Sequence, residues 1–586
     1  MNTVADKLMK LVQTKSDIRQ ALLDKGFNVP DTMPFSGYAD LIRRFPCNAK
    51  DFPDIPGMIA RWSAKGLTNE DMSTNPVWKD LMGNGYDLQM KNFLWGGMSG
   101  VGGYKLNWGD SSIWVNYITQ GARGTGEVTD NTIHITSAKS NNALFETRAS
   151  LKSVEYKVLI KGLTDDIYLR YGVSNDGKEL WTEIKNDGIY TLPSYDYDSK
   201  FNMKWKVMSQ TYPIDCNITI EQLPLYPGAI VFDGVDDYGI CENFPILTKE
   251  KGYTVVALRQ FLGSRDSFLI SNRVTGTAFS NGAFIFERFW EKSGAIFYNF
   301  GTPSDQLSLK PYSPFSYLTS KSYNGRATNA GDAVPSNTLL VGKSIINDSN
   351  STNAAIWEIC ILDHDATEEE LQKIQDYYKQ EYPWLFPDQA WTVVGKTNED
   401  TDRATIANIT GNGNNLVLSN LGFIEGSGYN EEGEYAGYLV TDGVDDKIQS
   451  SNFPMGKDFT VVGEWKLLSV SNYNYAGIVK SNNLYVYNSS TGINIYVCSS
   501  SAGNKMEGLK SLKAICSDGR VYDDNWVEYK LKNVGDNIGA NSTLDIGTNK
   551  NNFTKIAFKN LEIYNNKILS KEDCIKAYNY LQTLKS

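Results

Sequence analysis

Histidine is almost absent from this chain of 586 residues, which contains only His134 and His364. Neither is followed by a second histidine at metal-site spacing, which argues against zinc centres and Ser-His-Asp triads. There is also no glycine-rich phosphate loop with its Lys-Ser/Thr. These absences predict that the chain is not an enzyme and has no catalytic residues. Glycoside hydrolysis stays open as an alternative, because it needs only two carboxylates and the chain has 68 acidic residues.

Cysteine is scarce and dispersed. The seven cysteines form no CxxC pair and show no regular spacing. We therefore expect reduced, buried thiols, with no disulfide framework, no metal centre built on cysteine and no required cofactor.

A basic surface and long apolar runs are missing too. The formal net charge is −11, which argues against a nucleic-acid partner. No apolar run reaches membrane-spanning length, so no membrane partner is expected. The first residues lack both a basic start and an apolar core, so we expect no signal peptide and synthesis in a reducing cytoplasm.

What the sequence does have is a repeat. Short blocks occur twice in the same order, which indicates two copies of one domain. Each copy closes with a capping box, Thr367 to Glu370 and Ser570 to Asp573, that opens a final helix. The blocks of the first copy are 68–71, 83–85, 232–237, 253–256 and 338–342, and their counterparts are 397–400, 411–413, 441–446, 459–462 and 543–547.

The spacing of the blocks reveals an insertion in the first copy. The short step from Gly422 to Thr441 corresponds to a step from Trp95 to Phe232, which leaves room for a separate guest domain. We predict four units, which are a helical segment 1–45, a discontinuous domain 52–103 and 227–386, an inserted domain 104–226, and a second copy 388–586.

The repeated units predict a mainly β fold. An Asp-Gly turn joins two apolar runs in each copy, and the following segments alternate or run apolar, as the strands of a sandwich do. Segments 153–158, 167–171 and 217–221 alternate in the insertion. We therefore expect two jelly-roll sandwiches, one of which carries an inserted β-sandwich resembling a carbohydrate-binding module in shape.

The segment 1–45 has apolar residues at helical spacing, interrupted by Pro30 and Pro34. Such short helices bury little apolar surface alone. They need a partner, either further copies of themselves or a larger assembly. The alternative is a helical cap packed on the neighbouring domain.

Two resemblances accompany these patterns. The block 232–238, the strand at 253–256 and the ending at 358–371 resemble laminin-G/concanavalin A-like lectin domains, and both copies match. The segment 3–45, with motifs at 14–19, 25–26 and 34–38, resembles a leader of structural proteins from tailed phages, including crAss-like phages of Bacteroidetes.

The resemblances imply a fibre or decoration protein located in a virion. The N-terminal helices would bind virion structural proteins or form a homo-oligomer, with a trimer favoured, and the lectin-like domains would bind surface polysaccharide. The alternatives are a virion-associated polysaccharide-cleaving enzyme and an inert spacer that binds only its virion neighbours.

Aromatic and acidic residues supply the candidate binding sites. Tyrosine and tryptophan faces stack on sugar rings, and paired carboxylates suit Ca²⁺. Each candidate has a plainer alternative, namely core packing for the tryptophans, a solvated loop for 195–198, and turn geometry for the aspartate pairs. The carbohydrate candidates are Trp95, Trp108, Tyr195 and Tyr197, and the calcium candidates are Asp196, Asp198, Asp236, Asp237, Asp445 and Asp446.

Overall fold

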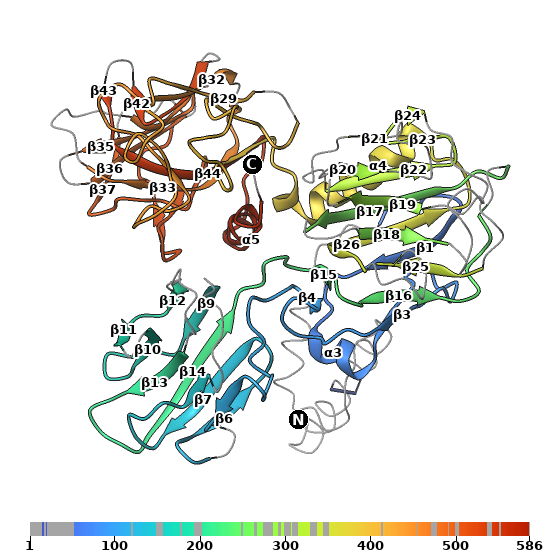
Figure 1. Cartoon of the computed structure of the whole chain (residues 1–586), viewed down its shortest axis with the longest axis horizontal. Coiled ribbons are helices and arrows are strands. Elements are labelled where there is room, and N and C mark those ends of the chain that lie inside the picture. Colours follow the sequence, from blue (N-terminus) through green and yellow to red (C-terminus); the bar gives the residue numbers. More distant parts are fainter. Residues whose placement is uncertain are drawn as a thin grey trace, which may run out of the picture.

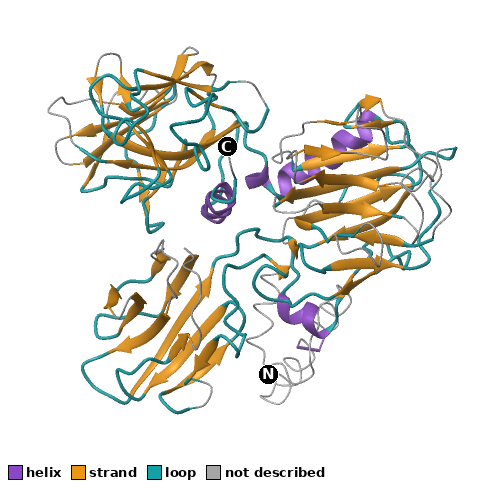
Figure 2. Cartoon of the chain, viewed as in Figure 1, coloured by secondary structure: helices purple, strands orange, loops and turns teal. Residues whose placement is uncertain are grey.

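The computed structural model describes residues 15, 16, 19 and 52–584 apart from internal gaps. The gaps are 119–120, 148–155, 176–177, 193–201, 248–249, 263–266, 273–284, 291–294, 298–305, 308–313, 328–336, 344–350, 412–413, 454, 470–476, 490–491, 499–502, 536–541 and 550–551. Apart from residues 15, 16 and 19, the predicted helical segment 1–45 lies outside the described residues. Strands make up most of the regular structure (Figure 2), which confirms the mainly β prediction.

The first sandwich consists of two eight-stranded antiparallel sheets. Sheet 1 has the order β24 (Arg326–Ala327), β23 (Ser322–Tyr323), β22 (Phe315–Thr319), β17 (Thr254–Phe261), β26 (Asn353–Leu362), β15 (Ile230–Asp233) and β4 (Gly100–Val101), with β1 (Met58–Ser63) beside β26. Sheet 2 has the order β2 (Val77–Trp78), β3 (Leu88–Lys91), β16 (Tyr238–Cys241), β25 (Leu339–Val341), β18 (Ser267–Ser271), β19 (Ile285–Trp290), β20 (Ala295–Phe297) and β21 (Gln306–Leu307).

The inserted sandwich consists of two five-stranded antiparallel sheets. One has the order β11 (Lys178–Ile184), β10 (Tyr168–Asn175), β13 (Asn202–Met208), β8 (Phe145–Thr147) and β5 (Trp114–Asn116). The other has the order β12 (Gly188–Leu192), β9 (Tyr156–Lys161), β14 (Ile214–Gln222), β7 (Thr132–Ala138) and β6 (Gly124–Val128). Alternating side chains from both sheets meet in one apolar core.

The second sandwich repeats the layout of the first. Sheet 3 has the order β30 (Gly428–Asn430), β31 (Tyr438–Val440), β44 (Ile556–Asn565), β33 (Phe459–Leu467), β38 (Ala514–Cys516), β39 (Arg520–Tyr522) and β40 (Glu528–Lys530), with β27 (Gln389–Thr392) beside β44. Sheet 4 has the order β28 (Thr405–Ile406), β29 (Leu416–Ser419), β32 (Lys447–Phe453), β41 (Ser542–Ile546), β34 (Gly477–Lys480), β35 (Leu484–Ser489), β36 (Gly492–Val497) and β37 (Asn504–Glu507). A small pair, β42 (Thr548–Asn549) and β43 (Asn552–Phe553), stands apart.

Strand register fixes which residues of the two copies correspond. Thr254 pairs with Leu362 across β17 and β26, and Thr460 pairs with Tyr564 across β33 and β44. Counting back along β26 and β44 from these pairs shows that Glu358 of the first copy and Asn560 of the second occupy corresponding positions. This correspondence matters below, because the two side chains have different surroundings.

Helices lie where the sandwiches meet. The capping box at Thr367 opens α4 (Glu368–Glu381), and Ser570 caps α5 (Lys571–Leu581). Two shorter helices are α3 (Asn69–Thr74) and the 3-10 helix η2 (Pro383–Leu385). Among the described residues, no helix is long and apolar enough to cross a membrane.

The helix α5 lies at the junction of the three sandwiches (Figure 1). The Trp357 ring of sheet 1 meets the Tyr580 ring of α5 edge to face, with centroids 6.0 Å apart. Lys157 of the inserted sandwich places its Nζ 3.8 Å from the centre of the Tyr578 ring. One apolar cluster includes Trp357, Ile189 of the insertion and residues of α5. The three sandwiches therefore share a packed junction.

Candidate functional site

An aspartate turn joins β15 to β16 in the first sandwich. The backbone N–H of Asp233 donates to Oδ2 of Asp237 at 3.0 Å, and the Ser99 hydroxyl donates to Oδ1 of Asp237 at 3.0 Å. The side-chain N–H of Asn92 donates to the carbonyl of Asp236 at 3.1 Å. Asp237 is fully buried and accepts hydrogen bonds at both carboxylate oxygens.

The second sandwich repeats these contacts atom for atom. The backbone N–H of Asp442 donates to Oδ2 of Asp446 at 2.7 Å, and the Ser427 hydroxyl donates to Oδ1 of Asp446 at 3.1 Å. The side-chain N–H of Asn420 donates to the carbonyl of Asp445 at 3.0 Å. The hydrogen bonds account for the shape of the turn in both copies without a ligand. Calcium binding at these turns stays a prediction.

Burial controls the charge of the turns. Burial, followed by the charge of Asp233, raises the pKa of Asp237 to about 8, and burial also raises the pKa of Asp446. Each cluster has one oxygen from each of three carboxylates within 4.8 Å of the others, a spacing that a divalent cation could bridge. The clusters are Asp233, Asp236 and Asp237, and Asp442, Asp445 and Asp446.

The structure corrects the prediction that Trp95 and Trp108 form sugar-binding surfaces. Trp95 is only 6% exposed and stacks on Phe93, with centroids 4.7 Å apart. Trp108 is 2% exposed and meets Phe145 and Tyr156 edge to face, with each pair of centroids 6.3 Å apart. Both indoles fill sandwich cores, so neither offers a ring face to a ligand.

The other predicted stretch, which contains Tyr195, Asp196, Tyr197 and Asp198, lies outside the described residues. It stays a prediction for both carbohydrate and calcium binding.

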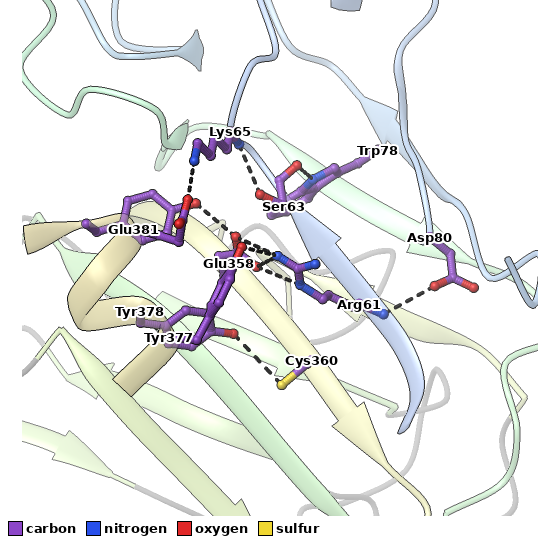
Figure 3. A network of polar contacts seen from close by, with 11 residues as sticks. Arg61, Ser63, Lys65, Trp78, Asp80, Glu358, Cys360, Tyr377, Tyr378 and Glu381 are labelled. Atoms are coloured by element: carbon purple, nitrogen blue, oxygen red, sulfur yellow. Dashed lines mark hydrogen bonds and ion pairs between the residues drawn. The ribbon is translucent and has the colours of Figure 1, made fainter. Parts of the chain in front are cut away.

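A buried ion pair joins β1 to β26 beneath α4 (Figure 3). The Arg61 guanidinium donates from Nε to Oε2 of Glu358 at 3.1 Å and from Nη2 to Oε1 at 3.2 Å. The Tyr382 hydroxyl donates to Oε1 of Glu358 at 2.9 Å, and Arg61 also donates to the Tyr377 hydroxyl at 3.1 Å. Burial raises the pKa of Glu358, and the charge of Arg61 opposes that effect. Because its partners come from the strand and helix that enclose it, the pair fastens α4 to sheet 1.

The second sandwich has a buried carboxylate with other partners. Glu464 of β33 accepts a hydrogen bond from the Tyr578 hydroxyl at 2.8 Å, and the ammonium groups of Lys513 and Lys559 lie 3.8 Å away. Burial opposes ionisation of Glu464, but the charges of Lys513, Lys559 and Lys157 hold its pKa well below the usual range. Glu464 therefore helps to join α5 to sheet 3.

The first sandwich has a polar cavity on the outward face of sheet 2. Its volume is about 340 Å³, and it lies between the ends of β3 and β16. Its lining is Gly85, Asp87, Gln89, Lys91, Ile240, Cys241 and Glu242. Asp87 is already engaged, because it accepts from the Lys79 ammonium at 2.7 Å and from the Asp80 backbone N–H at 2.9 Å.

The sequence reasoning missed a group of aromatic side chains on the outward face of sheet 4. We call Tyr485, Tyr487 and Tyr496 the tyrosine cluster. Tyr485 and Tyr487 lie two residues apart on β35. Tyr496 lies on the neighbouring strand β36, where it pairs with Tyr485. The Tyr-Val-Tyr alternation was a usable signal for Tyr485 and Tyr487, but the position of Tyr496 depends on strand register.

Comparison with known proteins identifies no family. No family model matches the chain, and no curated protein matches it. The chain is similar in structure to a sialidase of Trypanosoma rangeli in complex with sialic acid, with 9% identity over 78% of this chain and 83% of that chain and a TM-score of 0.25.

Two further solved structures are also similar to the chain. A tandem CBM22 domain from Paenibacillus barcinonensis gives 8% identity over 46% of this chain and 98% of that chain, with a TM-score of 0.14. The ligand-binding domain of botulinum neurotoxin serotype D, in complex with N-acetylneuraminic acid, gives 9% identity over 87% and 96%, with a TM-score of 0.16.

The matched structures include sialidases, which are enzymes, and this finding corrects the prediction that the chain is not an enzyme. At TM-scores this far below 0.5 and identities near 9%, the similarities carry no argument for a particular reaction or ligand. Catalysis is therefore included in the experiment that tests the proposed function.

Proposed function

We propose that the protein is an adhesive glycan-binding protein that presents its sandwiches to surface polysaccharide. The observation that carries this proposal is a contrast between the two copies. Their aspartate turns keep the same hydrogen bonds, whereas the outward faces of sheets 2 and 4 carry different side chains. A retained scaffold with one altered face is what a specialised binding module requires.

The two copies differ most clearly on the strands β25 and β41, which pair with β16 and β32. The first copy has the aliphatic Leu340, and the second copy has the carboxylate of Asp545 at the corresponding place on β41. The first copy forms the same sandwich without a carboxylate at this place on the outward side of its sheet. The carboxylate and the tyrosine cluster of the second copy support a binding role for that copy.

The setting in a tailed-phage virion is part of the same proposal. It is supported by the resemblance of segment 3–45 to leaders of phage structural proteins and by the lectin-like blocks of both copies. In this proposal the N-terminal segment binds virion structural proteins or forms a trimer. Several copies on one particle would then raise weak glycan binding by avidity.

The test is binding of the full-length chain to immobilised bacterial capsular polysaccharides, with and without EDTA. The proposal expects binding that strengthens with the number of chains displayed together. Absence of binding to every polysaccharide, even on a multivalent bead, would contradict it. The molecular mass of each polysaccharide after incubation is measured in parallel, because a fall in polymer length would establish cleavage as the function instead.

A further inference from the structure

The strands β35 and β36, which carry the tyrosine cluster, lie on the side of the second sandwich that is remote from α5 (Figure 1). Tyr485 and Tyr496 are half-buried, and Tyr487 is 5% exposed. Their neighbours along the strands, Leu484 and Val486, point into the core. The cluster therefore belongs to the outward face of sheet 4, where Tyr487 is buried and Tyr485 and Tyr496 keep part of their surface exposed.

The three rings form a nearly parallel group. Ring centroids lie 5.0 Å apart for Tyr485 and Tyr487, 6.2 Å for Tyr485 and Tyr496, and 5.7 Å for Tyr487 and Tyr496. The ring planes differ by 32°, 25° and 24°. A column of three rings would place its outer members about twice as far apart as neighbours. The three ring centroids therefore form a triangle and not a column.

A row of polar side chains continues the cluster across the sheet. Strand pairing places Gln449, Asp545 and Lys480 side by side on β32, β41 and β34, and Lys480 is paired with Tyr485. The Gln449 side-chain N–H donates to Oδ1 of Asp545 at 2.9 Å. With Tyr496 the row crosses five strands, or about 19 Å at the usual spacing of ~4.8 Å between strands.

The corresponding row of the first sandwich has a different character. Ile240, Leu340 and Ser271 occupy the places of Gln449, Asp545 and Lys480. Ile240 and Leu340 are 9% and 1% exposed. The same backbone therefore supports an aliphatic row in one copy and an aromatic-polar row in the other.

We infer that the outward face of sheet 4 is a polysaccharide-binding site, in which Tyr485 and Tyr496 stack on sugar rings and the polar row binds hydroxyl groups. This inference rests on the proposed function and names the site that performs it. Aromatic faces match the apolar C–H faces of a sugar ring. The amide of Gln449 and the ammonium of Lys480 offer donors and an acceptor, as hydroxyl groups require, and the buried carboxylate of Asp545 orients the Gln449 amide.

The form of the face favours a polysaccharide over other partners. A row about 19 Å long suits an extended chain, because successive sugar rings would meet successive strands. The net charge of −11 works against an anionic nucleic acid. Asp545 in the middle of the row is a poor fit to the apolar centre of a protein interface.

The test compares a double variant, Tyr485→Ala with Tyr496→Ala, to the unchanged chain by affinity electrophoresis in gels containing xylan, β-glucan or a bacterial capsular polysaccharide. We expect at least about tenfold weaker binding, because truncating two central aromatic contacts removes most of the stacking. Tyr485→Phe with Tyr496→Phe keeps both rings and should keep binding. The matched control is Tyr238→Ala, which removes a half-buried tyrosine from the outward face of sheet 2 and should leave binding unchanged.

The outcomes separate this inference from the proposed function. If the unchanged chain binds and the double-alanine variant, with an unaltered unfolding temperature, binds equally well, the site is overturned while glycan binding stands. If the unchanged chain binds none of the polysaccharides, the proposed function fails and the site falls with it. If no polysaccharide binds but the double variant abolishes self-association in sedimentation, the face is assigned to a second copy of the chain, which also overturns the inference.

Discussion

The two copies of the sandwich have the same aspartate turn but attach their terminal helices through different residues. In both, a serine hydroxyl and a backbone N–H hold the two oxygens of a buried aspartate. Beneath the terminal helices the copies diverge, because Glu358 is paired with Arg61 whereas the corresponding position holds Asn560. Between the two copies, the turns that set strand geometry keep the same hydrogen bonds, whereas the attachment of the terminal helix and the outward sheet face differ.

Removal of the ion pair between Arg61 and Glu358 should give the largest loss in the free energy of unfolding. Arg61→Ala leaves the carboxylate of Glu358 buried without its cation, which costs about 3–5 kcal/mol in the free energy of unfolding. Urea denaturation monitored by tryptophan fluorescence measures the loss. The matched control is Asn560→Leu, because no described residue hydrogen-bonds to the Asn560 amide. An equal loss in both variants would mean that the ion pair is not what distinguishes the copies.

The pH dependence of stability should come from the aspartate turns. The pKa of Asp237 is raised from 3.8 to about 8, so its stabilising contribution is fully present below about pH 4 and is lost as the pH rises through 8. The unchanged chain should therefore unfold at a lower temperature at pH 8.5 than at pH 5, by calorimetry. Asp237→Asn should reduce the difference in unfolding free energy between pH 5 and pH 8.5 by an amount on the order of a few kcal/mol. Asp446→Asn should act in the same direction.

The same calorimetry examines calcium. A bound cation favours the ionised carboxylates, so Ca²⁺ should restore the unfolding temperature at pH 8.5 if the turns bind it. Restoration that persists in a variant carrying both Asp237→Asn and Asp446→Asn would place the ion elsewhere.

Two corresponding glycines, each next to the serine that binds the buried aspartate, allow a further comparison of the two copies. Gly100 and Gly428 have φ of +144° and +158°, and an added Cβ would lie 2.5 Å from Oδ1 of Asn69 and 2.6 Å from Oδ1 of Asn398. We expect Gly100→Ala and Gly428→Ala each to lower the free energy of unfolding by about 1–3 kcal/mol, because of backbone strain and the close contact. Thermal unfolding of both variants measures this. Clearly unequal losses of unfolding free energy would show that the two copies are not equally rigid around these glycines.

Helix capping should give the smallest difference. At α4, the Thr367 hydroxyl accepts from the Glu370 N–H, and the Glu370 carboxylate accepts in return from the Thr367 N–H. Ser570 at α5 accepts from the Asp573 N–H at 3.0 Å. We expect Thr367→Ala to cost about 1 kcal/mol and Ser570→Ala somewhat less. Chemical denaturation of both variants measures the difference, and a larger loss for Ser570→Ala would contradict it.

Local patterns in the sequence predicted much of the fold. The Asp-Gly turns, the alternating strands and the helix caps each depend on residues that are close together in the chain, and the structure contains all three, although only α4 has the complete capping box. The mainly β prediction was correct for this reason. The indoles of Trp95 and Trp108 were placed wrongly, because exposure is decided by residues distant in sequence. Trp108, for example, is covered by Phe145 and Tyr156.

The tyrosine cluster escaped prediction for a related reason. Tyr485 and Tyr487 alternate along one strand, but Tyr496 joins them only through the register of β35 and β36. A shift of one residue in that register would send Tyr496 to the opposite face of the sheet. Composition and spacing contain no information on register between strands, so the cluster appears only in three dimensions.

The position of α5 has a consequence for biosynthesis. On the ribosome, α5 emerges after every strand that it contacts in sheet 1, the insertion and sheet 3. The junction of the three sandwiches can therefore close only late in translation, after the first sandwich and the insertion have had time to fold as units. Until then the outer apolar faces around Trp357 and Ile189 stay open to solvent, and a nascent chain stalled before α5 would expose them to aggregation and to chaperones.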